Sequence, residues 1–355
     1  MTQFLVRNII VVLIFGAIYS CSSEQENLST KSDPQTLFTL LDAKATGIDF
    51  LNKVKNQKNF NIFKYRNFYN GGGVAIGDIN NDGLADIYLT GNMVANKLYL
   101  NKGNFVFEDI SESAGIEGNK PWSTGVVMVD INQDGLLDIY VSNAGNLKGN
   151  NHDNDLYINN GDLTFTEKAS EFNLAKTGFS THASFFDYDK DGDLDAYILN
   201  NSNIPVSSLG YAEQRDKRAQ DWENVPTIFR GAGDMLLRND NGKGVDVSEQ
   251  AGIYGSLIGF GLGVMVTDMN GDLYPDIYVS NDFYERDYLY INNQDGTFKE
   301  DITNWTSHLS LSAMGVDIAD INNDGNADIF ITDMLPEADQ RVKSVMEFEG
   351  YNVFK

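Results

Sequence analysis

Asp78-Ile79-Asn80-Asn81-Asp82-Gly83-Leu84-Ala85-Asp86 is the first of five acidic nonapeptides in this 355-residue chain. Each copy has the form Asp-x-(Asn/Asp)-x-Asp-x-x-x-Asp and lies between two short apolar runs. The other four copies span residues 130–138, 187–195, 268–276 and 320–328. Such a recurrence predicts a repeat fold in which each unit contributes one loop of the same kind.

The oxygen atoms of each nonapeptide are spaced as ligands of a calcium-sized cation. Such hard cations bind carboxylate, amide and backbone carbonyl oxygens. Positions one, three, five and nine offer side-chain oxygens, and position seven offers a backbone carbonyl. We therefore predict up to five Ca²⁺ ions, bound by Asp78, Asn80, Asp82, Leu84, Asp86, Asp130, Asn132, Asp134, Leu136, Asp138, Asp187, Asp189, Asp191, Asp193, Asp195, Asp268, Asn270, Asp272, Tyr274, Asp276, Asp320, Asn322, Asp324, Asn326 and Asp328.

The alternative interpretation is an ordinary polar turn, since Asp, Asn and Gly favour turns through local hydrogen bonds. However, every copy places carboxylates at positions one, five and nine, and without a cation these would repel one another. The loops are not EF-hands, which need a bidentate Glu at position twelve. That position is apolar in all five copies: Leu89, Val141, Ile198, Val279 and Ile331.

The fourth copy departs from the others in the place of its glycine. Gly271 stands at position four, whereas the other copies have glycine at position six. Because glycine adopts positive φ most readily, this change predicts a different turn in the fourth loop.

The overall charge of the chain is strongly negative. It carries 51 acidic and 26 basic residues, a formal net charge of −25, of which five divalent cations would offset ten. Nucleic-acid binding depends on Lys and Arg that neutralise phosphates. The acidic balance therefore excludes nucleic acid as a partner.

Residues 1–20 have the features of an export signal peptide, with Arg7 before the apolar run 9–18. This run is too short for a lasting transmembrane helix. Cys21, the only cysteine, follows directly, and Ile18-Tyr19-Ser20-Cys21 resembles a bacterial lipobox. We expect a lipid anchor at Cys21 that ties the protein to a membrane, and a flexible tether over residues 21–36. The alternative is a free cysteine beside a conventional cleavage site.

The nonapeptides begin 52, 57, 81 and 52 residues apart, a period typical of propellers and other repeat arrays. Each is followed by an apolar run that favours an inner strand covered on both faces. In most units two more strands flank an Asn- and Gly-containing turn, as around 101–104 and 159–162. Four short antiparallel strands per unit predict an all-β chain of propeller blades.

The recurring loop, exit strand and hairpin resemble FG-GAP/VCBS repeats, the calcium-loop blades of integrin α-subunit propellers. Residues 71–78 and 113–116 resemble the ASPIC/UnbV-associated, CRTAC-like branch of exported bacterial proteins. The similarity covers roughly residues 37–335. It implies a β-propeller, commonly of about seven blades. With the polar residues after Cys21, it also implies an outer-membrane lipoprotein at the cell surface of a Gram-negative bacterium.

We expect the propeller over residues 37–355, with an insertion at about 200–231. Phe38–Leu41 and Thr46–Phe50 mirror the outer-strand segment 107–116, which predicts an amino-terminal outer strand of the kind that closes a ring. The fifth unit has no Asn-Gly hairpin after Asp333. The sequence therefore predicts an incomplete seven-bladed ring with an exposed blade edge.

Catalytic motifs are missing from the sequence: it contains no zinc signature, nucleophile elbow or phosphate loop. His182 replaces a glycine found five residues before the loop in the other units, so it is a candidate ligand contact or a polar channel lining. His152, in a polar loop, is a second candidate. Tyr211 and Trp222 in the insertion are further candidates, although Trp222 alternatively packs the insertion onto its blade.

These observations favour a noncatalytic, calcium-stabilised, lipid-anchored propeller that binds a glycan, peptide or protein partner. The competing hypothesis is an enzyme, a polysaccharide lyase or hydrolase, which requires His152, His182 and Tyr211 to converge on one face. A third hypothesis is a truncated fragment without independent activity.

Overall fold

The computed structural model describes residues 37–144, 151–201, 232–255, 259–283, 285–310 and 312–334. The chain divides into two units, Met1–Asp42 and Ala43–Lys355, and the account below concerns the second. The predicted signal peptide, Cys21, the tether, Tyr211 and Trp222 lie outside the described residues. The described part of the chain has no helix long and apolar enough to cross a membrane.

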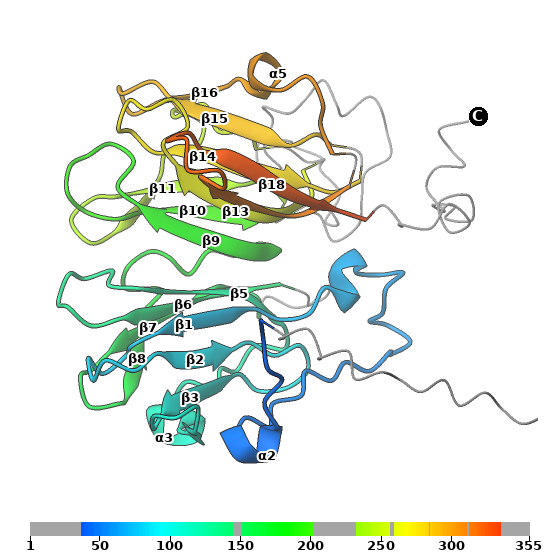
Figure 1. Ribbon diagram of the computed structural model, residues 1–355, viewed down its shortest axis with the longest axis vertical. Helices are drawn as coiled ribbons and strands as arrows, with labels where there is room; N and C mark the ends of the chain where they lie inside the picture. The colour runs from blue at the N-terminus through cyan, green and yellow to red at the C-terminus, as the bar shows by residue number, and fades with distance from the viewer. Residues whose placement is uncertain are drawn as a thin grey trace, which may run out of the picture. The chain divides into compact units, whose positions relative to one another are not determined.

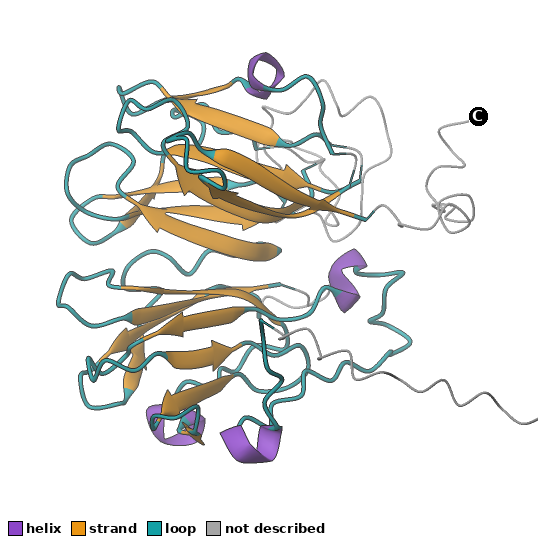
Figure 2. Cartoon of the chain, viewed as in Figure 1, coloured by secondary structure: helices purple, strands orange, loops and turns teal. Residues whose placement is uncertain are grey.

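The described part of the second unit is built from strands and loops, and the helices in it are single turns (Figure 2). Four sheets have four antiparallel strands each, and the fifth has two described strands (Figure 1). The strands are β1 (Val74–Gly77), β2 (Asp86–Leu89), β3 (Lys97–Asn101), β4 (Phe107–Asp109); β5 (Ser123–Val129), β6 (Asp138–Asn143), β7 (Asp155–Asn159), β8 (Phe165–Glu167); β9 (Ser180–Phe186), β10 (Asp195–Asn200), β11 (Met235–Asn239), β12 (Gly244–Asp246); β13 (Gly261–Thr267), β14 (Asp276–Asn281), β15 (Tyr288–Asn292), β16 (Phe298–Glu300); and β17 (Ala313–Ala319), β18 (Asp328–Asp333).

Each acidic nonapeptide joins the first strand of a sheet to the second. In the first sheet Gly77 pairs with Asp86, so the ninth residue of the loop is the first residue of β2. The second strands are buried on both faces in the middle sheets, where β6, β10 and β14 have no exposed residue. The predicted inner strands and outer hairpins are therefore confirmed.

Successive sheets pack through their first strands: β1 contacts β5, β5 contacts β9, β9 contacts β13 and β13 contacts β17. Glycine permits this close approach, since a Cβ on Gly73 would lie 2.7 Å from the Thr124 carbonyl oxygen. Separate apolar cores fill the spaces between neighbouring sheets, and aromatic and aliphatic side chains from both sheets contribute to each. This arrangement is a propeller-like fold.

The predicted amino-terminal outer strand is wrong. Phe38–Leu41 does not form a strand, and its side chains are exposed. Helix α2 (Ala43–Thr46) follows, and Gly47 ends it at φ 80°. In this respect the expected likeness to residues 107–116 holds, because α3 (Ser111–Ala114) in that segment also ends at a glycine with positive φ, Gly115. Sequence likeness to a strand is insufficient here, since a strand forms only when another strand satisfies its backbone.

The described residues form two further single-turn elements: the 3₁₀ helix η2 (Arg66–Tyr69) before β1, and α5 (Ile302–Trp305) after β16. An aromatic cluster surrounds η2, in which Tyr65, Phe68 and Phe179 pack with Trp122. The Trp122 ring is 5.2 Å from that of Phe68 and 5.6 Å from that of Tyr65. Segment 60–69 is therefore fixed against the second and third sheets.

Candidate functional site: acidic loops and an inner cavity

The first Asp of the nonapeptide organises the turn by accepting backbone hydrogen bonds. Asp78 Oδ1 accepts from the Asp82 N–H at 3.1 Å, and Asp78 Oδ2 accepts from the Gly83 N–H at 2.7 Å. The loops beginning at Asp130, Asp268 and Asp320 repeat both bonds. Position one therefore holds the loop in shape before any cation is considered.

Positions four and six have positive φ in all five loops, including the fourth. There Gly271 takes position four at 77°, and Leu273 takes position six at 72°. Leu273 N–H still donates to Asp268 Oδ2, at 2.7 Å. The expectation of a different turn in this loop is therefore wrong. The shared hydrogen bonds impose the same backbone, and Leu273 is held in a conformation that costs a side-chain-bearing residue about 1 kcal/mol.

The ninth Asp is buried in the first four loops and links the loop to the third strand. Asp138 Oδ2 accepts from the Ile131 N–H at 3.2 Å, and its Oδ1 accepts from the Asn159 N–H of β7 at 2.8 Å. Asp86, Asp195 and Asp276 repeat this arrangement. Sequence reasoning missed this second role, although the Asn that ends each third strand was a usable signal.

Burial raises the pKa of these ninth-position carboxyl groups, and neighbouring loop carboxylates add to the rise. The pKa of Asp138 reaches about 6, and that of Asp195 about 7. Buried carboxylates at neutral pH need a compensating positive charge. A divalent cation in the loop would supply that charge.

The third loop has the donor set that best fits a hard cation. One oxygen each from Asp187, Asp189 and Asp195 lie within 4.8 Å of one another. Asp187 Oδ1 and Asp193 Oδ1 are buried atoms without a hydrogen-bond partner. Asp189 stands where the other loops have Asn, and its pKa is raised by burial and by Asp191. All-oxygen ligands with unsatisfied lone pairs fit Ca²⁺.

Position-four side chains connect successive loops. Asn81 Nδ2 donates to the Gly135 carbonyl at 3.0 Å, and Gln133 Nε2 donates to the Gly192 carbonyl at 2.9 Å. In the third loop, Lys190 Nζ lies 4.4 Å from the centre of the Tyr274 ring. The fourth loop has Gly271 at this position, so it has no side chain to continue the series.

A cavity of about 690 Å³, which we call the inner cavity, is lined by residues from all five sheets and from the segment before β1. Its wall is formed by Asn67, Tyr69, Asn70, Gly71, Gly72, Gly73, Val74, Thr124, Gly125, Val126, Thr181, His182, Leu262, Met314 and Met334. Its size is in the range of ligand pockets, roughly 300–1,000 Å³.

The structure separates the two described histidine candidates. His182 lines the inner cavity, where its Nδ1 accepts from the Ala183 N–H at 2.8 Å. His152 is buried outside the wall of the cavity, with Nδ1 2.7 Å from the Gly178 carbonyl oxygen and its ring against Phe179. The convergent histidines that an enzyme would need are therefore not brought together on the cavity wall.

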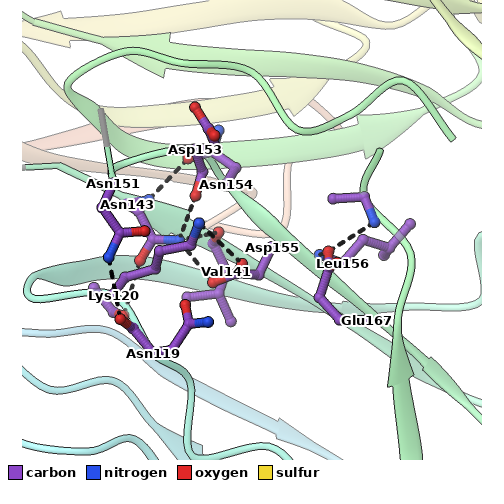
Figure 3. Close-up of polar contacts among 12 residues, drawn as sticks. Asn119, Lys120, Val141, Asn143, Asn151, Asp153, Asn154, Asp155, Leu156 and Glu167 are labelled. Atoms are coloured by element: carbon purple, nitrogen blue, oxygen red, sulfur yellow. Dashed lines mark hydrogen bonds and ion pairs between the residues drawn. The ribbon is translucent and has the colours of Figure 1, made fainter. Parts of the chain in front are cut away.

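An amide or carboxylate before each third strand is a repeated feature that sequence reasoning missed. Asn154 Oδ1 accepts from the Asn143 N–H at 2.8 Å, and its Nδ2 donates to the Tyr140 hydroxyl at 2.8 Å. Figure 3 shows Asn143 and Asn154 beside Asp155, whose Oδ1 lies 3.8 Å from Lys120 Nζ. In the fourth sheet Asp287 has the same place and binds Tyr278 and Asn281.

Comparison with known proteins gives the lineage of these repeats. The profile of the FG-GAP-like repeat matches residues 78–141, 144–198 and 268–331, which together exceed half of the chain. The chain belongs to the FG-GAP-like repeat family. This match confirms the repeat resemblance: all five acidic nonapeptides lie within the matched segments, and each segment runs from the strands of one sheet into those of the next.

Among curated proteins, this FG-GAP-like chain is similar to cartilage acidic protein 1. It is 34% identical to the Xenopus tropicalis protein over 137 residues, which is 38% of this chain and 20% of the relative. It is 28% identical to the Mus musculus protein over 216 residues, 59% of this chain and 29% of the relative. The chain thus spans less than a third of the length of these relatives.

Two solved structures are similar at low identity. One is an Agrocybe aegerita lectin that recognises non-reducing terminal N-acetylglucosamine, with 19% identity, a TM-score of 0.37, and coverage of 72% of this chain and 59% of that one. The other is the V. cholerae biofilm matrix protein Bap1, with 15% identity, a TM-score of 0.32, and coverage of 73% and 34%.

Proposed function

We propose that this FG-GAP-like chain is a noncatalytic binding module whose acidic loops hold Ca²⁺. The observation that carries the metal part is the third loop, where buried carboxylate oxygens of Asp187 and Asp193 have no partner. In the other four loops, positions one, three, five and nine offer side-chain oxygens and position seven a backbone carbonyl, so up to five ions would bind. Each would offset repulsion among carboxylates and stabilise its loop.

The binding role rests on the repeat family and on the inner cavity. The partner would be a glycan, a peptide or a protein, and the described residues of the cavity wall include no pair of groups arranged for acid–base catalysis. We also propose that export and a lipid anchor at Cys21 place the module at the cell surface of a Gram-negative bacterium, as an outer-membrane lipoprotein of the CRTAC-like, ASPIC/UnbV-associated branch.

A closed ring, of about seven blades as in related propellers, is a further part of this proposal. Val74 and Ile76 on β1 are 58% and 65% exposed, whereas Val126, at the equivalent place on β5, is 5% exposed. Phe330 on β18 is 59% exposed, although the equivalent Tyr278 is buried. Additional sheets would cover both apolar faces.

Calorimetry with and without a chelator tests the metal part. Calcium at ten times its dissociation constant stabilises by about 1.4 kcal/mol per site, so several sites should raise the melting temperature markedly. We expect excess chelator to lower the melting temperature and broaden the transition, and Ca²⁺ but not Na⁺ to reverse this. An unchanged transition in chelator would refute calcium binding.

A further inference from the structure

We infer that residues 51–64, which we call the basic segment, bind the surface of an anionic lipid bilayer. This inference adds a membrane contact to the lipid anchor of the proposed function, and it does not depend on acylation at Cys21. It starts from the uneven charge of the chain and extends to the contacts that hold this segment on the sheets.

The basic segment is positively charged in a strongly acidic chain. Residues 50–77 include five basic residues and no acidic residue, although the formal net charge of the chain is −25. Four of the five are exposed lysines that make no ion pair with any residue that the structure describes: Lys53, Lys55, Lys58 and Lys64. Five lysines elsewhere, in contrast, each lie within 3.8 Å of a carboxylate oxygen: Lys97, Lys102, Lys120, Lys168 and Lys299. The segment therefore presents positive charge that the described residues do not neutralise.

Apolar side chains of the basic segment fix its position on the body of the protein. Val54, Phe60 and Ile62 pack against the aromatic cluster around Trp122. The two lysines that flank Val54 are exposed, so they lie on the outer side of the segment. The packing of these apolar side chains therefore holds the lysines at the surface.

Hydrogen bonds hold the backbone of the basic segment in one conformation. Asn61 Nδ2 donates to the Gln57 carbonyl at 2.8 Å, and Asn61 Oδ1 accepts from the Phe63 N–H at 3.0 Å. Asn52 Nδ2 donates to Asn92 Oδ1 at 2.9 Å, which ties the start of the segment to the loop after β2. A surface that is already ordered loses little conformational entropy when it binds a partner.

Two exposed apolar side chains accompany the lysines. Phe63 is 74% exposed, and Leu51 is 70% exposed. Near an anionic bilayer, lysines are attracted to the headgroups, while aromatic and aliphatic side chains enter the boundary between headgroups and acyl chains. A soluble acidic polymer would use the lysines and leave both apolar side chains in water. The basic segment therefore fits a bilayer surface better than a soluble acidic polymer.

The position of the basic segment determines which end of the protein faces the bilayer. The segment precedes β1, whereas the first acidic nonapeptide begins directly after Gly77, the last residue of β1 (Figure 1). The two therefore lie at opposite ends of this strand. Contact through the basic segment directs the acidic loop away from the anionic lipids, which would repel its carboxylates.

Vesicle sedimentation tests the inference on the full chain with Cys21→Ser, which excludes a covalent lipid. The probes, used in the presence of Ca²⁺, are vesicles of phosphatidylcholine alone and vesicles of phosphatidylcholine and phosphatidylglycerol in equal parts. The variant in which Gln replaces all four exposed lysines of the segment should bind the anionic vesicles at least about a hundredfold more weakly, since each lysine contributes about fivefold. Residues 1–20 are the same in every variant, so the ratio of affinities reports the basic segment.

The matched control replaces four lysines outside the segment with Gln: Lys102, Lys168, Lys243 and Lys299. It changes the net charge by the same amount and should leave vesicle binding nearly unchanged. Raising the salt concentration from about 0.1 M to about 1 M should release the parent protein, because the Debye length falls from about 10 Å to about 3 Å. Equal binding by the parent protein and by the variant of the basic segment would overturn the inference, as would equal binding of the parent protein to both kinds of vesicle.

Phe63→Trp measures contact with the acyl chains and the orientation of the protein. Lipids with brominated acyl chains should quench the fluorescence of the new Trp in anionic vesicles. Phe105→Trp is the matched control, because Phe105 is 68% exposed in the turn between β3 and β4, at the end of the strands where the first acidic loop lies. It should add no quenching to that of the parent protein. Equal quenching of the two variants would contradict the orientation.

The remaining outcomes separate this inference from other partners and from the proposed function. Binding of the parent protein to alginate, a soluble acidic polysaccharide, with no binding to anionic vesicles would overturn the inference in favour of a glycan. Calcium-dependent melting without vesicle binding would refute this inference alone. Vesicle binding through the four lysines, with melting that does not change in chelator, would support this inference and refute the metal part of the proposed function.

Discussion

Leu273 is an exposed residue whose backbone conformation favours glycine. It is 75% exposed at φ 72°, in the place where four of the five loops have glycine. We predict that Leu273→Gly raises the free energy of unfolding by about 1 kcal/mol, because it relieves left-handed strain and removes little packing. Denaturant unfolding in excess calcium would measure this. Leu84→Gly, at a position without positive φ, should be neutral or destabilising, and the same gain there would contradict the explanation.

Asp189 distinguishes the third loop from the other four, which have Asn at position three. In the first loop Asn80 Nδ2 donates to Asp82 Oδ2 at 3.0 Å, a bond that a carboxylate cannot make. Asp189→Asn should therefore stabilise the calcium-free protein and weaken calcium binding severalfold through lower ligand charge. Calorimetry and lanthanide luminescence would measure the two effects. Asn132→Asp is the reverse change in the second loop, and equal effects of both variants on affinity would contradict the prediction.

Asp287 predicts a pH dependence that does not involve the acidic loops. Burial raises its pKa from 3.8 to about 6, so the folded state retains its proton more strongly than the unfolded state. The resulting stability is fully present below pH 3.8 and is lost as the pH rises through 6. Asp287→Asn should flatten this dependence and gain up to about 3 kcal/mol at pH 7.

Asn154 supports this substitution, because it fills the same place in the second sheet with an amide. The measurement is urea unfolding from pH 4 to pH 8. Glu249→Gln changes an exposed carboxyl group on the same chain and should leave the pH profile unchanged. An Asp287→Asn profile parallel to that of the parent protein would contradict the assignment.

The outer hairpins are tied to the loops by the Asn that ends each third strand. Asn159 Nδ2 donates to the Leu137 carbonyl of its own loop at 3.1 Å and to the Ile79 carbonyl of the preceding loop at 2.8 Å. We expect Asn159→Ala to cost about 2–3 kcal/mol, at roughly 1 kcal/mol per lost bond. Asn101→Ala in the first sheet lacks the bond to a preceding loop and should cost about 1 kcal/mol less. Equal losses in thermal unfolding would show that the link between sheets contributes nothing.

The strands and hairpins could be predicted from the sequence because apolar runs and Asn-Gly turns are local signals. The conformation of the fourth loop could not be predicted, since backbone hydrogen bonds accepted by Asp268 override the preference of Leu273 for negative φ. The strand expected at Phe38–Leu41 failed because pairing depends on a partner strand. The second role of the ninth Asp required the register of β3, β7, β11 and β15.

The described part of the second unit exposes apolar residues at its two outermost sheets. Ile76→Lys on β1 should change the free energy of unfolding by less than about 0.5 kcal/mol, because the side chain is already in contact with water. Val126→Lys at the packed face of β5 should lower the free energy of unfolding by about 3 kcal/mol, because it buries an unpaired charge. Analytical ultracentrifugation and chemical denaturation of both variants would check this. Strong destabilisation by Ile76→Lys would mean that another sheet or another molecule covers the face.

The side chains of Asn81, Gln133 and Lys190 each contact the next loop, so they couple the first four loops mechanically. An ion entering one of them would restrict the next, so their filling should be cooperative, with a Hill coefficient above one. Gly271 has no side chain to contact the fifth loop, which should therefore bind its ion independently, with its own midpoint in the calcium titration. Metal titration would then resolve two phases, and a longer side chain at residue 271 should merge them.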